Sequence, residues 1–254
     1  MQLIDTHCHL DEPDFDADRA DVLARARAAG VETIVIPSIR PASWARSLAL
    51  AGPGIAVALG AHPQIVYDLS DDEERALRDL PARLPPGVIA VGECGLDGGS
   101  PDPARQERIF RLQIALAREL RLPLLIHVLR AHDVAPRLLT EERAGEVGGI
   151  LHSYSGGEEL VPIYRDLGFH FSFAGPVTYA RARRPVAAAR AVPDELLLAE
   201  TDAPDQTPEP YRGRRCEPAF VREVVAGLAA ARGRPVEEIA ALTTANARRL
   251  LQLA

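Results

Sequence analysis

Six side chains of the types that bind metals lie at or just after short apolar or β-branched segments. They are His7, His9, Glu93, His127, His152 and Asp202. Alternate residues of an extended segment point to the same side, so the imidazoles of His7 and His9 can reach one ion. A lone His-x-His pair is weak evidence. The same placement after five separate segments favours a shared site.

Imidazole and carboxylate ligands suit zinc, manganese, iron or magnesium, and the sequence does not choose among them. Six ligands exceed the need of one tetrahedral ion, and with one bridging carboxylate they can hold two divalent ions about 3.5–4 Å apart. All 29 basic residues are arginine, so a carbamylated lysine cannot be the bridge. We expect Glu93 to bridge. Such a pair lowers the pKa of a water to about 7, which predicts metal-dependent hydrolysis.

Taken singly, each of these residues also has a structural interpretation. Glu93 could be a surface carboxylate in a turn, and Asp202 could cap the loop that follows it. An isolated His127 or His152 after an apolar segment is more often a hydrogen-bonded core residue. The joint metal-site interpretation is favoured because the same position recurs after each segment.

Eight segments are predicted as strands, and helical patterns alternate with them. The predicted strands are Leu3–His7, Thr33–Pro37, Ile55–Ala61, Val88–Glu93, Pro123–His127, Gly149–His152, Phe169–Phe173 and Leu196–Glu200. The clearest helical patterns are Ala17–Ala29, Asp72–Leu84 and Arg105–Arg121, in which apolar residues recur every three or four positions.

This alternation predicts an α/β fold, a single and distorted (β/α)8 TIM barrel over residues 1–254. Residues 217–254 add two or three helices at the C-terminal end. In such a barrel the carboxyl ends of the strands meet at one mouth, which would gather the six ligands. A doubly wound sheet is the alternative, but it usually carries a glycine-rich phosphate turn after its first strand, where this chain has His-Cys-His.

Composition restricts the class of protein. A formal charge of −7 and a pI near 5.5 argue against a protein that coats nucleic acid or an anionic membrane. The three cysteines (Cys8, Cys94 and Cys216) form no CxxC pair, which favours a reducing compartment. No apolar segment has the length of a signal or a membrane span. We expect a cytoplasmic protein with no membrane partner and no obligate protein partner.

The sequence resembles the TatD family of metal-dependent hydrolases, within the amidohydrolase superfamily. The resemblance covers nearly the whole chain. Its motifs are IDTHCHL at 4–10, GAHP at 60–63, GECGLD at 92–97, HSYSG at 152–156, ETDAP at 200–204 and TTANARRL at 243–250. The stretch at 122–127 also matches.

The resemblance implies two divalent ions (Mg, Mn or Zn). His7, His9, Glu93 and Asp202 would bind the first ion, and Glu93, His127 and His152 the second. It also implies a deoxyribonuclease that trims single strands from the 3′ end, with Asp202 taking the proton from the attacking water and Glu93 as the second catalytic residue. The alternative is a barrel hydrolase of a small amide, lactone or phosphoester. The partners expected are therefore DNA ends or a small phosphoester.

Three departures from the family's sequence pattern lie at positions that are expected to contact substrate. They are Gly98-Gly99 in place of an aromatic pair, Arg130 one position later than the usual arginine, and Cys216 in place of an asparagine.

The residues predicted to bind substrate are His62, Arg130, Tyr154 and Arg212. His62 could instead orient a ligand or be a turn histidine. The cluster of Arg212, Arg214 and Arg215 could contact phosphate, although a solvated loop is slightly favoured. His170 lies inside a strand and is left out of the site.

Overall fold

The computed structural model describes residues 1–253, and its centre is one parallel sheet of eight strands in the order β1 to β8. The strands are β1 Leu3–Asp5, β2 Val31–Pro37, β3 Ile55–Leu59, β4 Val88–Asp97, β5 Leu124–Leu129, β6 Gly149–Leu151, β7 Phe169–Phe173 and β8 Leu197–Ala199. The backbone N–H of Thr6 donates to the Ala199 carbonyl at 3.3 Å, which joins the last strand to the end of the first. The sheet is therefore a (β/α)8 barrel, as the sequence predicts.

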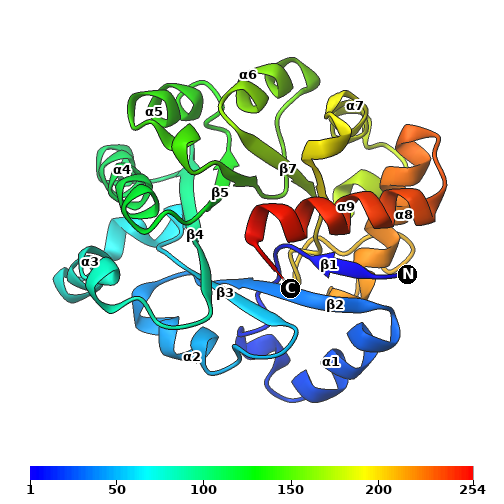
Figure 1. Cartoon of the computed structure of the whole chain (residues 1–254), viewed down its shortest axis with the longest axis horizontal. Coiled ribbons are helices and arrows are strands. Elements are labelled where there is room, and N and C mark those ends of the chain that lie inside the picture. Colours follow the sequence, from blue (N-terminus) through cyan, green and yellow to red (C-terminus); the bar gives the residue numbers. More distant parts are fainter. Residues whose placement is uncertain (254) are drawn as a thin grey trace.

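Helices surround the barrel and separate the strands along the chain (Figure 1). They are α1 Arg19–Ala28, α2 Trp44–Leu48, α3 Asp71–Arg78, α4 Pro103–Leu120, α5 Ala135–Glu141, α6 Val161–Asp166, α7 Arg183–Ala191, α8 Val221–Arg232 and α9 Val236–Leu251. The two closing helices α8 and α9 confirm the predicted C-terminal addition. No helix among the described residues is both long and apolar enough to cross a membrane.

Several predicted strand ends are wrong. The first and third strands end two residues earlier than predicted, at Asp5 and Leu59, whereas β4 and β5 continue beyond the residues expected to end them. Pairing between these strands runs from Gly95 opposite His127 to Asp97 opposite Leu129, after a register shift between Val91 and Cys94. Glu93 and His127 therefore lie inside their strands. This long-range pairing supplies the hydrogen bonds that hold the extra residues extended.

The predicted helix over 72–84 is shorter in the structure. The Ser70 side chain and Glu73 form a reciprocal capping box at the start of α3, and α3 ends at Arg78. A separate 3-10 turn follows over Leu80–Arg83, with Pro81 near its start. Proline provides no N–H and its ring clashes with the preceding turn, so it cannot continue an α-helix from within.

The barrel interior is apolar at the base, the end where the strands begin. One buried cluster there combines strand residues with two residues of α9: Ile4, Val35, Ala58, Ala90, Leu125, Ile150, Leu198, Ala247 and Leu251. Helix α9, red in Figure 1, covers this end. His170 of β7 pairs in register with Ile150 of β6, so His170 is the β7 residue at the level of this apolar cluster. The opposite end, the mouth, is left open for polar side chains.

Candidate metal centre

The loops after β1 and β8 are joined at the mouth, which brings His7 and His9 to Asp202. The N–H of Asp202 donates to the His7 carbonyl at 2.9 Å, and the N–H of His9 donates to the Ala203 carbonyl at 2.8 Å. Oδ1 of Asp202 lies 3.5 Å from Nε2 of His9 and 3.6 Å from Nε2 of His7. These three side chains, remote in sequence, form one group at the mouth.

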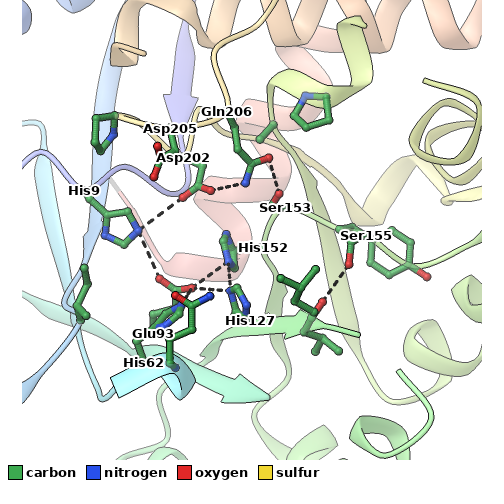
Figure 2. A pocket seen from close by; sticks show the side chains of 18 of the residues that line it. His9, His62, Glu93, His127, His152, Ser153, Ser155, Asp202, Asp205 and Gln206 are labelled. Atoms are coloured by element: carbon green, nitrogen blue, oxygen red, sulfur yellow. Dashed lines mark hydrogen bonds and ion pairs between the residues drawn. The ribbon is translucent and has the colours of Figure 1, made fainter. Parts of the chain in front are cut away.

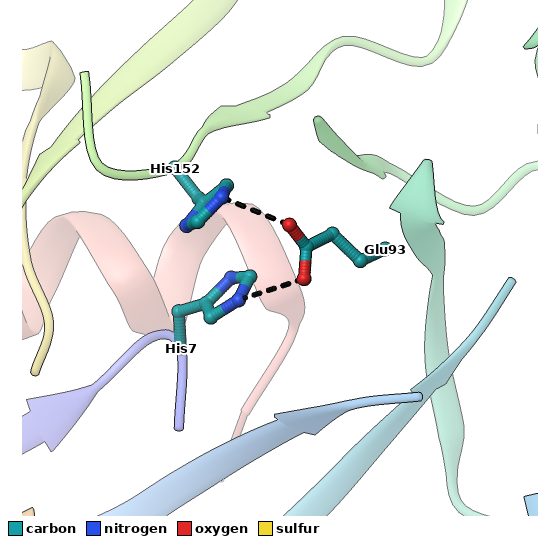
Figure 3. Close-up of side chains that lie close together, drawn as sticks. All are labelled: His7, Glu93 and His152. Atoms are coloured by element: carbon teal, nitrogen blue, oxygen red, sulfur yellow. Dashed lines mark hydrogen bonds and ion pairs between the residues drawn. The ribbon is translucent and has the colours of Figure 1, made fainter. Parts of the chain in front are cut away.

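Glu93 lies between two groups of histidines, and each of its oxygens faces one of them (Figures 2 and 3). Oε2 is 3.1 Å from Nε2 of His7 and 3.5 Å from Nε2 of His9. Oε1 is 2.9 Å from Nε2 of His152 and 3.1 Å from Nδ1 of His127. The carboxylate therefore lies between the two histidine groups and presents one oxygen to each.

Hydrogen bonding among the imidazoles of this cluster leaves several of their nitrogens without a partner. Nε2 of His7 and Nε2 of His9 are 3.3 Å apart, and Nδ1 of His127 is 3.0 Å from Nε2 of His152. At most one proton can serve each pair, and further ring nitrogens such as Nδ1 of His7 and Nε2 of His127 are buried without a partner. Cations placed among these donors would satisfy the converging lone pairs, so the residues fit divalent metal ions.

Three overlapping sets have ligand atoms that all lie within 4.8 Å of one another: His7, Glu93 and His152; His7, His9 and Asp202; His62, Glu93 and His127. The structure therefore brings all six predicted ligands together, and it adds His62. Nε2 of His62 is 3.0 Å from Oε1 of Glu93. The sequence alone leaves the role of His62 open, and in the structure its side chain lies beside the ligand cluster.

The electrostatics of the cluster keep its carboxylates ionised. Burial opposes ionisation, but the neighbouring histidines His62, His152 and His7 hold the pKa of Glu93 well below its usual range. Burial likewise opposes ionisation of Asp202, and its hydrogen bond to His9 lowers its pKa to about 2. Burial lowers the pKa of His7, which favours the neutral imidazole. Ionised carboxylates and neutral imidazoles are the forms that bind metal.

A buried carboxylate behind the cluster was missed by the sequence analysis. Oε1 of Glu200 lies 3.4 Å from Nδ1 of His152 and accepts a hydrogen bond from the N–H of Ser153. Oε2 of Glu200 accepts from the hydroxyl of Thr6 at 3.4 Å. A carboxylate on the second nitrogen of a ligating histidine fixes the ring orientation and tautomer. The sequence did carry a signal for Glu200, because this residue directly follows a buried strand and precedes Asp202 by two positions.

A cavity of about 840 Å³ opens above the cluster. Figure 2 shows His9, His62, Glu93, His127, His152 and Asp202 facing into it, with Gln206 bonded to Asp202 on one side. One part of its wall is apolar and includes Phe173, Pro176, Val177 and Pro185. No arginine of the described residues lines this cavity. The cavity floor is polar and can hold cations, while its walls carry both apolar and acidic side chains.

The four residues predicted to bind substrate occupy different places. His62 and Tyr154 line the cavity, although the Tyr154 hydroxyl already donates to the Gly157 carbonyl at 2.9 Å. The structure does not bring Arg130 to the cavity, since its exposed side chain bonds the Asp97 carboxylate. Arg212 also lies outside, with its guanidinium over the Tyr179 ring. Arg130 and Arg212 therefore lie on the outer surface, where they contact the Asp97 carboxylate and the Tyr179 ring.

Comparison with known proteins supports the same interpretation. A family model described as TatD related DNase matches residues 4–252. An uncharacterized metal-dependent hydrolase, YabD of Bacillus subtilis, is 38% identical and the match covers 99% of each chain. The 3′-5′ ssDNA/RNA exonuclease TatD of Salmonella typhimurium is 34% identical, again over 99% of each chain.

A solved structure agrees with both the sequence and the fold. The crystal structure of YJJV, a TatD homolog from Escherichia coli, superposes with a TM-score of 0.93 at 34% identity, covering 99% of this chain and 98% of that one. The chain therefore belongs to the TatD family and is a metal-dependent hydrolase of that type.

Proposed function

We propose that the protein hydrolyses phosphodiester bonds at the 3′ end of single-stranded nucleic acid, using two divalent ions. The observation that carries this proposal is the Glu93 carboxylate, whose two oxygens face separate sets of imidazole nitrogens. Two relatives of this chain are named 3′-5′ ssDNA/RNA exonuclease and cover nearly its whole length. A two-ion site is a common solution for phosphodiester hydrolysis.

In this proposal Glu93 is a ligand of both ions, and the other ligands are divided between them. His7, His9, Glu93 and Asp202 would hold one ion, and Glu93, His127 and His152 would hold the other, with His62 beside it. When bound, such ions neutralise charge on the phosphate and lower the pKa of the attacking water.

Asp202 has the position to accept the proton of the attacking water. Its Oδ2 accepts a hydrogen bond from the Gln206 side-chain amide, while Oδ1 faces the floor of the cavity. A carboxylate with a pKa of about 2 is ionised at neutral pH and can act as a base. Nε2 of His9 lies 3.5 Å from Oδ1 of Asp202, so the two side chains are neighbours at the mouth.

A second candidate substrate is a small phosphoester, amide or lactone. It is favoured by the cavity lining, which has no arginine among the described residues and includes the acidic side chains of Glu12, Asp14 and Asp205. A long polyanion would be repelled by these carboxylates.

A substrate panel with several metals distinguishes the two candidates. Purified protein is analysed for bound metal, then assayed with Mg²⁺, Mn²⁺ or Zn²⁺ on a 5′-labelled oligonucleotide, bis(p-nitrophenyl) phosphate and small lactones. We expect two divalent ions per chain and stepwise shortening of the oligonucleotide. Asp202→Asn should lower the rate about 10³-fold or more and leave the circular dichroism spectrum unchanged. Turnover of lactones alone, or unchanged cleavage by the variant, would contradict the proposal.

A further inference from the structure

The loop between β7 and α7 and the first turn of α7 carry arginines that have no carboxylate partner among the described residues. Arg181, Arg183 and Arg184 are exposed, and no aspartate or glutamate oxygen of the described residues lies within 4 Å of their guanidinium groups. Elsewhere on the surface arginines are commonly paired, as Arg25 is with Glu217 at 2.7 Å and Arg105 is with Glu74 at 2.8 Å. In a protein of net charge −7, unpaired arginines that stand close together form a local positive surface.

Arg212 extends this surface from the loop after β8. Its guanidinium lies 4.3 Å from the centre of the Tyr179 ring, and its one carboxylate contact among the described residues is Glu209 at 3.8 Å. The Tyr179 ring thus holds Arg212 beside Arg181, and both line the same hollow. We refer to Arg181, Arg183, Arg184 and Arg212 as the arginine rim.

The arginine rim is continuous with the cavity above the metal centre. Pro176 and Pro185 line both the cavity and the hollow that contains Arg181 and Arg212. A further hollow shares Tyr179 and Arg181 with that one and adds Arg183 along α7. Three hollows therefore succeed one another from the metal centre outward, and arginines line the outer two.

The side of the mouth formed by the loop after β1 has the opposite charge. Glu12 and Asp14 line the cavity there, and no arginine of residues 1–253 lies within 4 Å of either carboxylate. An anionic strand that leaves the cavity meets repulsion on this side and attraction over α7, which lies between α6 and α8 around the barrel (Figure 1).

We propose that the arginine rim binds the phosphate backbone of the strand whose 3′ end lies in the cavity, so that the strand leaves the site over the loop between β7 and α7. This inference rests on the proposed function, because it takes single-stranded nucleic acid as the substrate. Arginine suits the role since its planar guanidinium contacts phosphate through two hydrogen bonds. The contacts are to phosphate, so the surface confers affinity without sequence preference.

The test compares two triple variants of the full-length protein that remove the same charge. R181Q/R183Q/R184Q changes the arginine rim. R27Q/R83Q/R121Q changes three exposed arginines that also have no carboxylate partner within 4 Å among the described residues. These lie near the base: Arg27 one residue before the end of α1, Arg83 at the end of the 80–83 turn, and Arg121 directly after α4. All six side chains are exposed, so neither variant should affect folding.

Binding is measured by fluorescence anisotropy with a labelled dT20 strand in EDTA, so that no turnover is needed. We expect the rim variant to bind about tenfold more weakly or worse, with a salt dependence that is smaller by about 2 in log–log slope for three lost contacts. The R27Q/R83Q/R121Q variant should bind dT20 with the affinity of the unmodified protein. Equal affinities for the two variants, no binding of dT20 by the unmodified protein, or binding only to phosphatidylserine vesicles would overturn the inference.

Measured rates of hydrolysis distinguish a failure of this inference from a failure of the proposed function. The rim variant should lose kcat/KM on dT20 and keep its rate on bis(p-nitrophenyl) phosphate, which is too small to reach the rim. If the unmodified protein cleaves neither substrate, the proposed function fails and the anisotropy result still decides whether the rim binds a strand. If both variants cleave dT20 equally well, the role of the rim is wrong.

Discussion

The two ends of the barrel interior are equally buried and chemically opposite. At the base, aliphatic side chains from the strands pack against Ala247 and Leu251 of α9. At the mouth, His7 and Glu93 are as inaccessible to solvent, with 0% and 1% of their surface exposed. An apolar layer is satisfied by packing alone, whereas buried imidazoles and carboxylates need partners. The base can therefore supply stability, while the mouth stays incomplete until it binds something.

Truncation at the base should have the largest effect on stability and none on metal binding. Leu251→Ala leaves a cavity among fully buried neighbours, and we expect it to lower the free energy of unfolding by about 2–5 kcal/mol. Urea denaturation measures the change. Ile163→Ala, at an exposed position on α6, is the matched control and should change stability by about 0.5 kcal/mol or less. Loss of bound metal in Leu251→Ala would show that the two ends are not independent.

His170 is the exception at the base, and its removal should reduce acid sensitivity. Burial, followed by the charge of Arg249, lowers the pKa of His170 to about 4, while Glu195 opposes this weakly. Because the pKa of the folded state is below the unfolded value of 6.5, the unfolded chain binds more protons between these values, and stability is lost as the pH falls from 6.5 towards 4. The loss amounts to up to about 3 kcal/mol.

His170→Leu removes the titrating group and both unpartnered ring nitrogens. The difference in unfolding free energy between pH 7 and pH 4.5 should shrink relative to the unmodified protein, as measured by urea denaturation at both values. An unchanged pH dependence would mean that His170 is not neutral in the folded state.

Substitution of Glu200 tests whether metal affinity at the mouth depends on the carboxylate behind His152. Glu200→Gln keeps an acceptor for the Ser153 N–H but removes the negative charge beside Nδ1 of His152. We expect Mn²⁺ affinity to fall about 10–100-fold, or roughly 1.4–2.7 kcal/mol, in isothermal titration calorimetry. Metal-free stability should change little by comparison. Unchanged affinity would show that ring orientation is set by packing alone.

The fold was predictable because its signals are local. Each apolar strand is buried on both faces, and the helical patterns between strands are long enough to recognise, as the prediction of α4 within two residues shows. That the six candidate ligands would lie together was predictable for a related reason, since one topological rule places the C-terminal parts of parallel strands at one mouth.

The remaining features depend on contacts between distant segments. The continuation of β4 past Glu93 depends on pairing with β5, about thirty residues away in the sequence, and nothing in GECGLD alone indicates it. His62 reaches Glu93 only because β3 and β4 are neighbours. The arginine rim was partly anticipated through Arg212, but Arg214 and Arg215 are not part of it, and Arg215 pairs with Asp18 and Glu217.

The position of Glu93 inside β4 has a consequence for selectivity. Four more residues of the strand follow it, from Cys94 to Asp97, which at a rise of about 3.3 Å per residue extends the wall by about 10 Å beyond the carboxylate once strand tilt is included. The strands raise the wall in this way only on the side of β4 and β5, since β1, β3 and β8 end at Asp5, Leu59 and Ala199, before the residues that face the cavity. Loops form the rest of the entrance, so a substitution in those loops changes access to the ligands without moving Glu93.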